Sequence, residues 1–209
     1  MYRLQFFIVG LMLSASLNAQ TLSIGVKAGP TSSWQTGWCC EEYSSRPGLT
    51  GGLTGSLAIS RVFGLQAEIL FAEKGIRGPA GFVMRQDYLE VPLLVRATRP
   101  RGALASPVLL VGVAPALELS CSGVTTQLTL ASSESTPHVP LECDSWRTFR
   151  GELGLVLAVG LDVPTGRAVW TSELRFTRGL SDLTRGWDYI PQTKNRALVL
   201  MFGVRSSER

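Results

Sequence analysis

The sequence predicts an all-β protein that folds as an eight-stranded antiparallel up-and-down transmembrane β-barrel. Eight segments alternate apolar and polar residues with a period of two, which is the spacing of a β-strand. The connections between these segments are alternately long and short. An even number of strands, with short turns at one end and long loops at the other, is typical of bacterial outer-membrane barrels.

The eight strands follow one another along the chain with no helical period between them. We expect them at residues 21–29, 48–60, 65–75, 87–96, 107–120, 148–163, 167–178 and 196–205. Strands of about nine to thirteen residues can cross a bilayer when they are tilted. Pro92 falls inside the fourth strand, and proline has no N–H to donate to a ladder. We therefore expect Pro92 at a bulge or at a locally unpaired position.

The first nineteen residues are expected to be a signal peptide, and residues 20–209 the barrel domain. Arg3 supplies a positive charge, residues 4–13 are mostly apolar, and small residues precede Gln20. The apolar run is shorter than the roughly 20 residues of a spanning helix. The predicted location is the bacterial outer membrane.

Alternation alone leaves open which face of the barrel is outside, because a soluble lipocalin-like barrel alternates too. In each strand, one set of alternate residues is largely apolar, and we call it the aliphatic phase. Its aromatic residues collect near both ends of the strands, as at two membrane interfaces, and this favours a lipid-facing exterior. These residues are Phe71, Phe149 and Phe176 at the long-loop end, and Phe63, Trp170 and Phe202 at the short-turn end.

The opposite phase carries charges of both signs among glycine, alanine and threonine. An eight-stranded barrel is just wide enough for its own side chains to fill it, so these charges are expected to pair inside. The predicted interior network consists of Lys27, Glu68, Lys74, Glu90, Arg96, Glu118, Glu152, Glu173 and Arg175. Arg150 falls in the same phase.

Several segments resemble the PorT-like family of small porin-type outer-membrane β-barrels. They read SIGVKAGP, RPGLTGG, LQAEILFAEKG, DYLEVPLLVR and KNRALVLMFGVR, and the resemblance extends from about Thr21 to Arg205. Its most specific part is Glu68 with Lys74-Gly75 and the run from Tyr88 to Pro92. The resemblance implies an eight-stranded barrel in the outer membrane, and it implies no activity.

Four cysteines in an exported chain favour disulfides, and three connectivities are open. We favour Cys121–Cys143, which would close the longest loop and contribute roughly 3 kcal/mol. Cys39 and Cys40 would then form a strained adjacent pair or remain free. Adjacent cysteines lack the spacing of a zinc site, so we expect no metal and no cofactor.

The sequence favours a structural or interaction role without enzymatic activity. His138 is the only histidine and lies in a predicted loop, so a catalytic role is disfavoured. Candidate recognition residues in the loops are Trp34, Trp38, Trp146 and Trp187.

The expected partners are outer-membrane lipid and an extracellular or periplasmic protein of unknown identity. No Lys/Arg cluster interleaves with aromatic residues, so a nucleic-acid partner is not expected. We expect a monomer. The alternatives left open are a narrow channel for small solutes and a secreted, lipocalin-like ligand-binding barrel.

Overall fold

The computed structural model describes residues 22–37, 43–79, 81–99, 104–125, 139–142, 150–182 and 193–207. These residues form one antiparallel sheet, and within them no helix is long and apolar enough to cross a membrane. The strands are β1 (Leu22–Thr36), β2 (Ser44–Ala58), β3 (Phe63–Arg77), β4 (Val83–Glu90), β5 (Leu93–Thr98), β6 (Ser106–Thr125), β7 (Val139–Glu142), β8 (Gly151–Thr165), β9 (Ala168–Gly179) and β10 (Lys194–Ser206).

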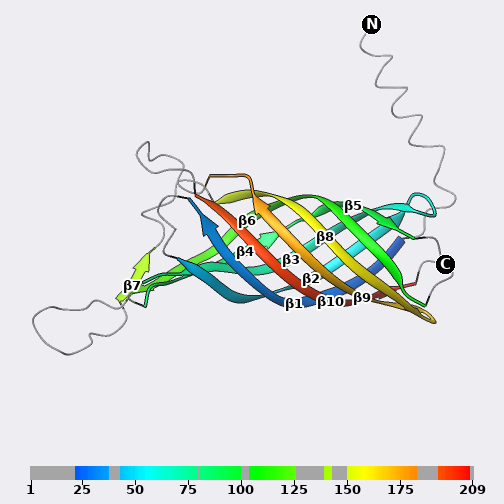
Figure 1. Cartoon of the computed structure of the whole chain (residues 1–209), viewed down its shortest axis with the longest axis horizontal. Helices are drawn as coiled ribbons and strands as arrows, with labels where there is room; N and C mark the ends of the chain where they lie inside the picture. The colour runs from blue at the N-terminus through cyan, green and yellow to red at the C-terminus, as the bar shows by residue number, and fades with distance from the viewer. Residues whose placement is uncertain are drawn as a thin grey trace, which may run out of the picture.

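The sheet closes into a barrel because β1 pairs with β2 on one side and with β10 on the other. β4 and β5 are two halves of one strand position, since each of them pairs with both β3 and β6. β7 pairs with β6 alone and lies off the ring. The ring therefore has the eight strand positions that the sequence predicts (Figure 1).

The register of the ladders sets the tilt of the strands. A path of cross-strand partners that starts at Trp34 and visits each strand position once returns to β1 at Ile24, ten residues earlier. With a rise of about 3.3 Å per residue and strands about 4.8 Å apart, that shift over eight strands corresponds to a tilt of about 40°. Outer-membrane barrels have tilts in this range.

The prolines lie where a ladder can lose a hydrogen bond. Pro92 separates β4 from β5, as expected, and its carbonyl accepts a 3.0 Å hydrogen bond from the Glu68 N–H. Pro30 lies inside β1, where the ladder with β10 skips two residues and resumes at Thr31. Pro30 remains opposite Leu49 on the β2 side. The first strand therefore continues to Thr36, and the prediction that it ends at residue 29 is wrong.

Other strands also extend further toward the long-loop end than predicted. β2 begins at Ser44, and β6 runs to Thr125, so Cys121 lies in a strand and not in a loop. β7 lies within a segment predicted to be loop. In these extensions polar residues occupy both faces, so the ladder continues where the period-two pattern of the sequence has faded.

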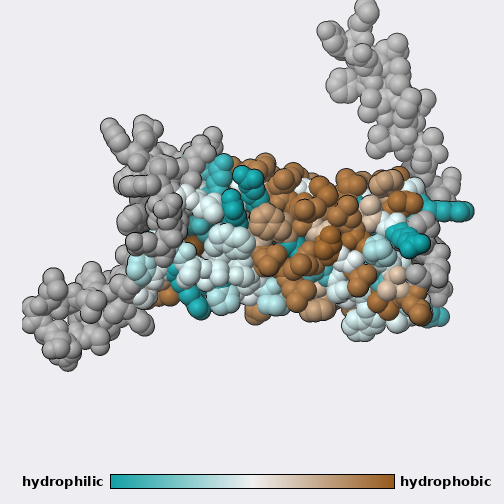
Figure 2. All heavy atoms as spheres, in the orientation of Figure 1, coloured by the Kyte–Doolittle hydropathy of each residue, from teal (hydrophilic) through white to brown (hydrophobic). Residues whose placement is uncertain are grey.

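The aliphatic phase faces outward. Mid-strand residues such as Val111 and Leu157 are 43% and 51% exposed. Figure 2 shows apolar side chains gathered in a brown band across the middle of the face in view. A contiguous apolar surface of this extent requires lipid or a partner. This arrangement is the reverse of a soluble lipocalin-like barrel.

The outward aromatic residues lie near both borders of this band. Phe63, Trp170 and Phe202 are more than half exposed toward the short-turn end, and Phe71 is 42% exposed toward the other end. Phe149 lies outside the described residues.

Candidate functional site

The interior of the barrel holds all nine charged side chains of the predicted network, each buried to less than a tenth exposure. They form three groups along the barrel axis, which we name by position. The central cluster is Lys27, Glu68, Glu173 and Arg175; the long-loop cluster is Lys74, Tyr88, Glu90, Glu118, Glu152 and Asn195; the short-turn cluster is Arg96, Asp162 and Arg205.

The central cluster alternates two cations with two carboxylates from strands β1, β3 and β9. Lys27 Nζ lies 2.6 Å from Glu68 and 2.8 Å from Glu173. The Arg175 guanidinium lies 2.8 Å from Glu68 and 2.7 Å from Glu173. The four formal charges cancel, which is the condition under which buried ions are tolerated.

Two glycines flank Lys27 where neighbouring strands leave no room for a Cβ. Gly52 and Gly203 are the cross-strand partners of Lys27 on β2 and β10. A Cβ at Gly203 would lie 2.8 Å from the Lys27 Cβ, and one at Gly52 would lie 2.0 Å from the Ile69 carbonyl oxygen. The glycine-rich segment of β2 therefore serves close packing inside the barrel, and it does not precede a helix as a phosphate-binding loop would.

The long-loop cluster is built around Lys74. Its Nζ lies 2.7 Å from Glu90 and 3.4 Å from Glu152, and it lies 4.7 Å from the centre of the Tyr88 ring. The Asn195 amide donates hydrogen bonds to Glu152 (2.9 Å) and to the Tyr88 hydroxyl (3.3 Å).

The Tyr88 hydroxyl extends this cluster by donating to Glu118 at 3.3 Å. The Gln86 amide donates to the same carboxylate at 3.4 Å and accepts a hydrogen bond from Gln35 at 3.2 Å. A continuous polar network therefore crosses the lumen from β1 to β8 at this level.

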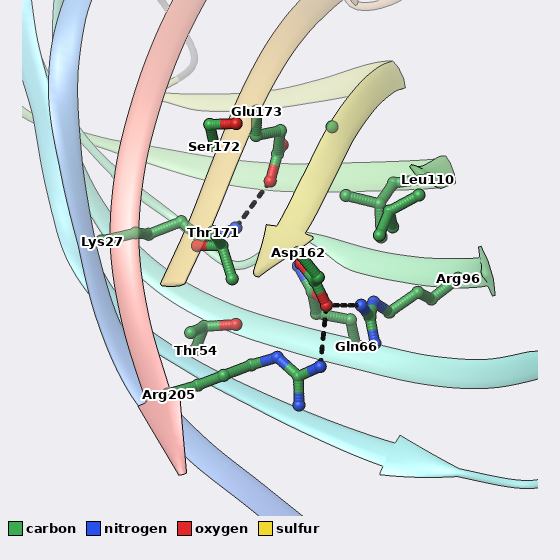
Figure 3. A pocket seen from close by; sticks show the side chains of 12 residues that line it. Lys27, Thr54, Gln66, Arg96, Leu110, Asp162, Thr171, Ser172, Glu173 and Arg205 are labelled. Atoms are coloured by element: carbon green, nitrogen blue, oxygen red, sulfur yellow. Dashed lines mark hydrogen bonds and ion pairs between the residues drawn. The ribbon is translucent and has the colours of Figure 1, made fainter. Parts of the chain in front are cut away.

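The short-turn cluster places one carboxylate between two arginines. Asp162 forms an ion pair with Arg96, and its Oδ2 lies 2.8 Å from the Arg205 guanidinium (Figure 3). Arg205 also donates to the Ser23 hydroxyl at 3.1 Å. The cluster joins β1, β5, β8 and β10 at the end of the barrel that carries the short turns.

A small cavity separates the short-turn cluster from the central cluster (Figure 3). Thr54, Gln66, Leu110 and Thr171 line it together with charged side chains of both clusters. The space open to the centre of a water molecule is about 20 Å³. This cavity has room for about one or two waters, and not for a solute of metabolite size.

An apolar layer lies between the central and long-loop clusters. Leu70, Val199 and Met201 are each at most 5% exposed and pack together with Ala197. On β3, Leu70 lies between Glu68 and Lys74 along the strand, so the layer separates the two polar groups. A second apolar set lines the wall formed by β5, β6 and β8, namely Leu94, Val108, Leu110, Ala114, Val156 and Ala158.

The sequence matches the family described as outer membrane protein beta-barrel domain over residues 18–185, which is most of the chain. The chain belongs to this family. No curated protein sequence matches it. Together with the lipid-type exterior, family membership places this outer-membrane barrel in the bacterial outer membrane.

Three solved structures are similar to this outer-membrane barrel. Neisserial surface protein A matches at 11% identity and a TM-score of 0.50, over 88% of this chain and 96% of that one. OprG from Pseudomonas aeruginosa matches at 13% identity, TM-score 0.47, over 90% and 96%. Ail of Yersinia pestis matches at 15% identity, TM-score 0.44, over 88% and 97%. At these identities the likeness concerns the fold alone.

Sequence reasoning missed two charged members of the barrel's interior. Asp162 shares the inward phase of Glu152 on β8, so the period of two could have identified it. Arg205 lies at the end of β10, whose phase the sequence left unassigned. Leu70 shares the phase of Glu68 on β3, so the period of two could have identified it as well. The inward Met201 lies on β10, whose phase the sequence left unassigned. Arg150, assigned to the inward phase, is exposed just before β8.

The predicted loop residues of this barrel fall mostly outside the described part of the chain. Trp34 was predicted in a loop, but it lies in β1, with its ring centre 6.3 Å from that of Phe176. Cys121 is disulfide-bonded. Its predicted partner Cys143 lies outside the described residues, as do Cys39, Cys40, Trp38, His138, Trp146, Trp187 and residues 1–21. Within the described ranges, no cluster of His, Cys, Asp or Glu could hold a metal ion.

Charges on the outer wall of the barrel appear beyond the apolar band, at the long-loop ends of the strands. On β3 and β4 they neutralise one another, with Arg85 lying 2.7 Å from Glu73 and 3.1 Å from Asp87. The hydrogen bond and charge of Asp87, followed by the charge of Glu73, raise the pKa of Arg85 above its ordinary value.

Proposed function

We propose that this outer-membrane barrel is a closed scaffold with a plugged, charge-paired interior and a structural or interaction role. The observation that supports the proposal best is the sequence of layers along the lumen. Two ion-paired groups flank a cavity of about 20 Å³, and an apolar layer separates the central cluster from a third group. Every layer is made by side chains of the barrel wall itself.

A solute or ion crossing these layers would meet two different barriers. It would have to separate buried ion pairs, and removing one partner of such a pair costs about 3–5 kcal/mol. It would also have to pass side chains such as Leu70 and Met201, and apolar constrictions close pores by excluding water. The narrow small-solute channel remains the alternative proposal.

Planar-bilayer recordings distinguish the scaffold from the channel. Folded wild-type protein should give no stepwise conductance, because no layer of the lumen opens without breaking contacts. A double variant, Leu70→Gly with Met201→Gly, thins the apolar layer and serves as the matched comparison. Reproducible wild-type conductance steps, from protein shown to be folded by faster migration when unboiled, would contradict the closed scaffold.

An interaction role through the long-loop end is supported by the hairpin of β6 and β7. β6 has 20 residues, and its last four, from Ser122 to Thr125, pair with β7 outside the ring (Figure 1). A paired ribbon is a more rigid support for a binding surface than an open loop. We propose that the segment it carries holds an extracellular protein partner.

This interaction role is testable without disturbing the barrel. Thr125 and Val139 are cross-strand partners, so residues 126–138 can be replaced by an Asn-Gly type I′ turn. The shortened protein should keep its heat-modifiable fold and should lose a protein that crosslinks to the wild type on cells. Identical crosslinking patterns for the two proteins would contradict a partner at this segment.

The proposal also covers the narrower family of the chain and its lack of enzymatic activity. The motifs around Glu68, Lys74 and Tyr88 support membership in the PorT-like branch of small barrels. The proposed scaffold has no enzymatic role, works as a monomer and uses no cofactor.

A further inference from the structure

The outer wall carries three cations at the long-loop ends of β9 and β10. These residues, which we call the basic wall, are Arg178, Lys194 and Arg196. Arg178 is the cross-strand partner of Leu155, which is 46% exposed on the outer face. Arg196 lies two residues from Leu198, which is 43% exposed on that face. The basic wall therefore begins where the apolar band ends.

The cations of the basic wall repel one another in this arrangement. Arg196 and Arg178 are direct cross-strand partners, and like charges in such positions are destabilising. Within the described parts of the chain, none of the three cations forms an ion pair, and the buried Nε of Arg196 has no hydrogen-bond partner. The outer-wall Arg85 differs, because it contacts two carboxylates.

An aromatic surface adjoins the basic wall. Trp34 is the cross-strand partner of Arg196 on β1, and its ring lies near that of Phe176 on β9. Tryptophan is enriched at the level of lipid headgroups. In Figure 2, hydrophilic atoms gather at the border of the apolar band where Figure 1 shows the long-loop ends of β9 and β10.

We propose that the basic wall binds the phosphate of an anionic lipid in the outer leaflet. The long loops of outer-membrane barrels face the cell exterior, so the basic wall lies at the headgroups of that leaflet. Two neighbouring guanidinium groups can hold a phosphate through paired N–H···O bonds. The lipid's acyl chains would lie along the apolar band below, beside Phe176 and Leu198.

The lipid supplies the charge that the protein lacks at this position. A phosphate between Arg178 and Arg196 removes their mutual repulsion and gives the Arg196 side chain acceptors. A cation close to an anionic membrane surface contributes about 1 kcal/mol, so two of them predict roughly a thirtyfold preference for an anionic lipid over a neutral one.

Native mass spectrometry of the folded, full-length mature protein in neutral detergent measures this preference. The probes are dioleoylphosphatidic acid and dioleoylphosphatidylcholine, which have the same acyl chains and differ in the headgroup. Wild-type protein should retain phosphatidic acid about thirtyfold more strongly. The double variant R178Q/R196Q should retain the two lipids within about twofold of each other, whereas the control R85Q should keep the wild-type preference.

A charge reversal tests the same site without weakening the fold. Arg178→Glu places a carboxylate opposite Arg196, so the protein supplies its own counter-ion and the repulsion disappears. This variant should fold at least as well as the wild type, as judged by heat-modified migration, and should lose the preference for phosphatidic acid. If R178Q/R196Q does not fold, the lipid preference of R178E alone tests whether the basic wall binds the anionic lipid.

Three results would overturn the proposal. The first is an unchanged lipid preference in folded R178E, and the second is the absence of any preference in the wild type. The third is displacement of phosphatidic acid by inorganic phosphate at equal concentration, because that would show a free-anion site to which the acyl chains add nothing. Retention of phosphatidic acid against an excess of inorganic phosphate supports a lipid site.

Discussion

Glu68→Gln should lower the free energy of unfolding by about 3–5 kcal/mol. The Glu68 side chain is fully buried and lies within 2.8 Å of both Lys27 and Arg175. Its replacement leaves two buried cations facing the single carboxylate of Glu173. Reversible urea unfolding in phospholipid vesicles, followed by tryptophan fluorescence, measures the change.

Two matched variants show whether charge imbalance is the cause. Glu73→Gln makes the same substitution on the same strand, but Glu73 pairs on the outer wall with Arg85, which is 46% exposed. Exposed pairs contribute at most about 1 kcal/mol, so this control should stay close to the wild type. Adding Lys27→Met to Glu68→Gln restores one cation per carboxylate and should recover most of the loss. An E68Q protein within about 0.5 kcal/mol of the wild type would contradict a buried ion-paired cluster.

The assignment of residues to the two faces could be predicted from the sequence because the side-chain period of a strand is two. Once one member of a phase faces the lumen, every member of that unbroken strand does. Nine charged residues on seven strand segments therefore reached the interior together. Because proline has no N–H to donate, the sequence also predicted an unpaired position for Pro92, and the break between β4 and β5 confirms it.

The partners within the interior could not be predicted in the same way. Which charges share a height depends on the ten-residue shift of the ladders and on interruptions such as the skip at Pro30. Lys27 meets Glu173 across 146 residues of chain only because those registers place them level. No local sequence pattern specifies the register between strands that are so far apart in the chain.

Strand length and the apolar layer escaped prediction for a related reason. The period-two signal depends on lipid on one side and a polar lumen on the other. Beyond the membrane both faces are polar, so β1 and β6 continue without a pattern. Inside the lumen, the hydrophobicity of Leu70 and Met201 does not show which side of the barrel wall they occupy. Only the phase of Glu68 on the same strand indicates the position of Leu70.

Val111→Arg should destabilise the barrel in a bilayer by about 2–4 kcal/mol, the cost of an arginine at the lipid face near the midplane. Val111 is 43% exposed within the apolar band on β6, and its cross-strand partners are the apolar Val95 and Leu157. A guanidinium at this position would have no water or carboxylate within reach except by distorting the bilayer. Urea unfolding in vesicles again provides the measurement.

The position along the strand should matter as much as the substitution. Leu119 lies on the outer face of the same strand, next to the irregular register at Asp87, where polar residues begin. Leu119→Arg should therefore cost only about 0–1 kcal/mol. On a water-exposed wall both substitutions would fall within about 0.5 kcal/mol of the wild type. A gradient from Val111 to Leu119 is specific to lipid, because only a bilayer makes the cost of one charge depend on its depth.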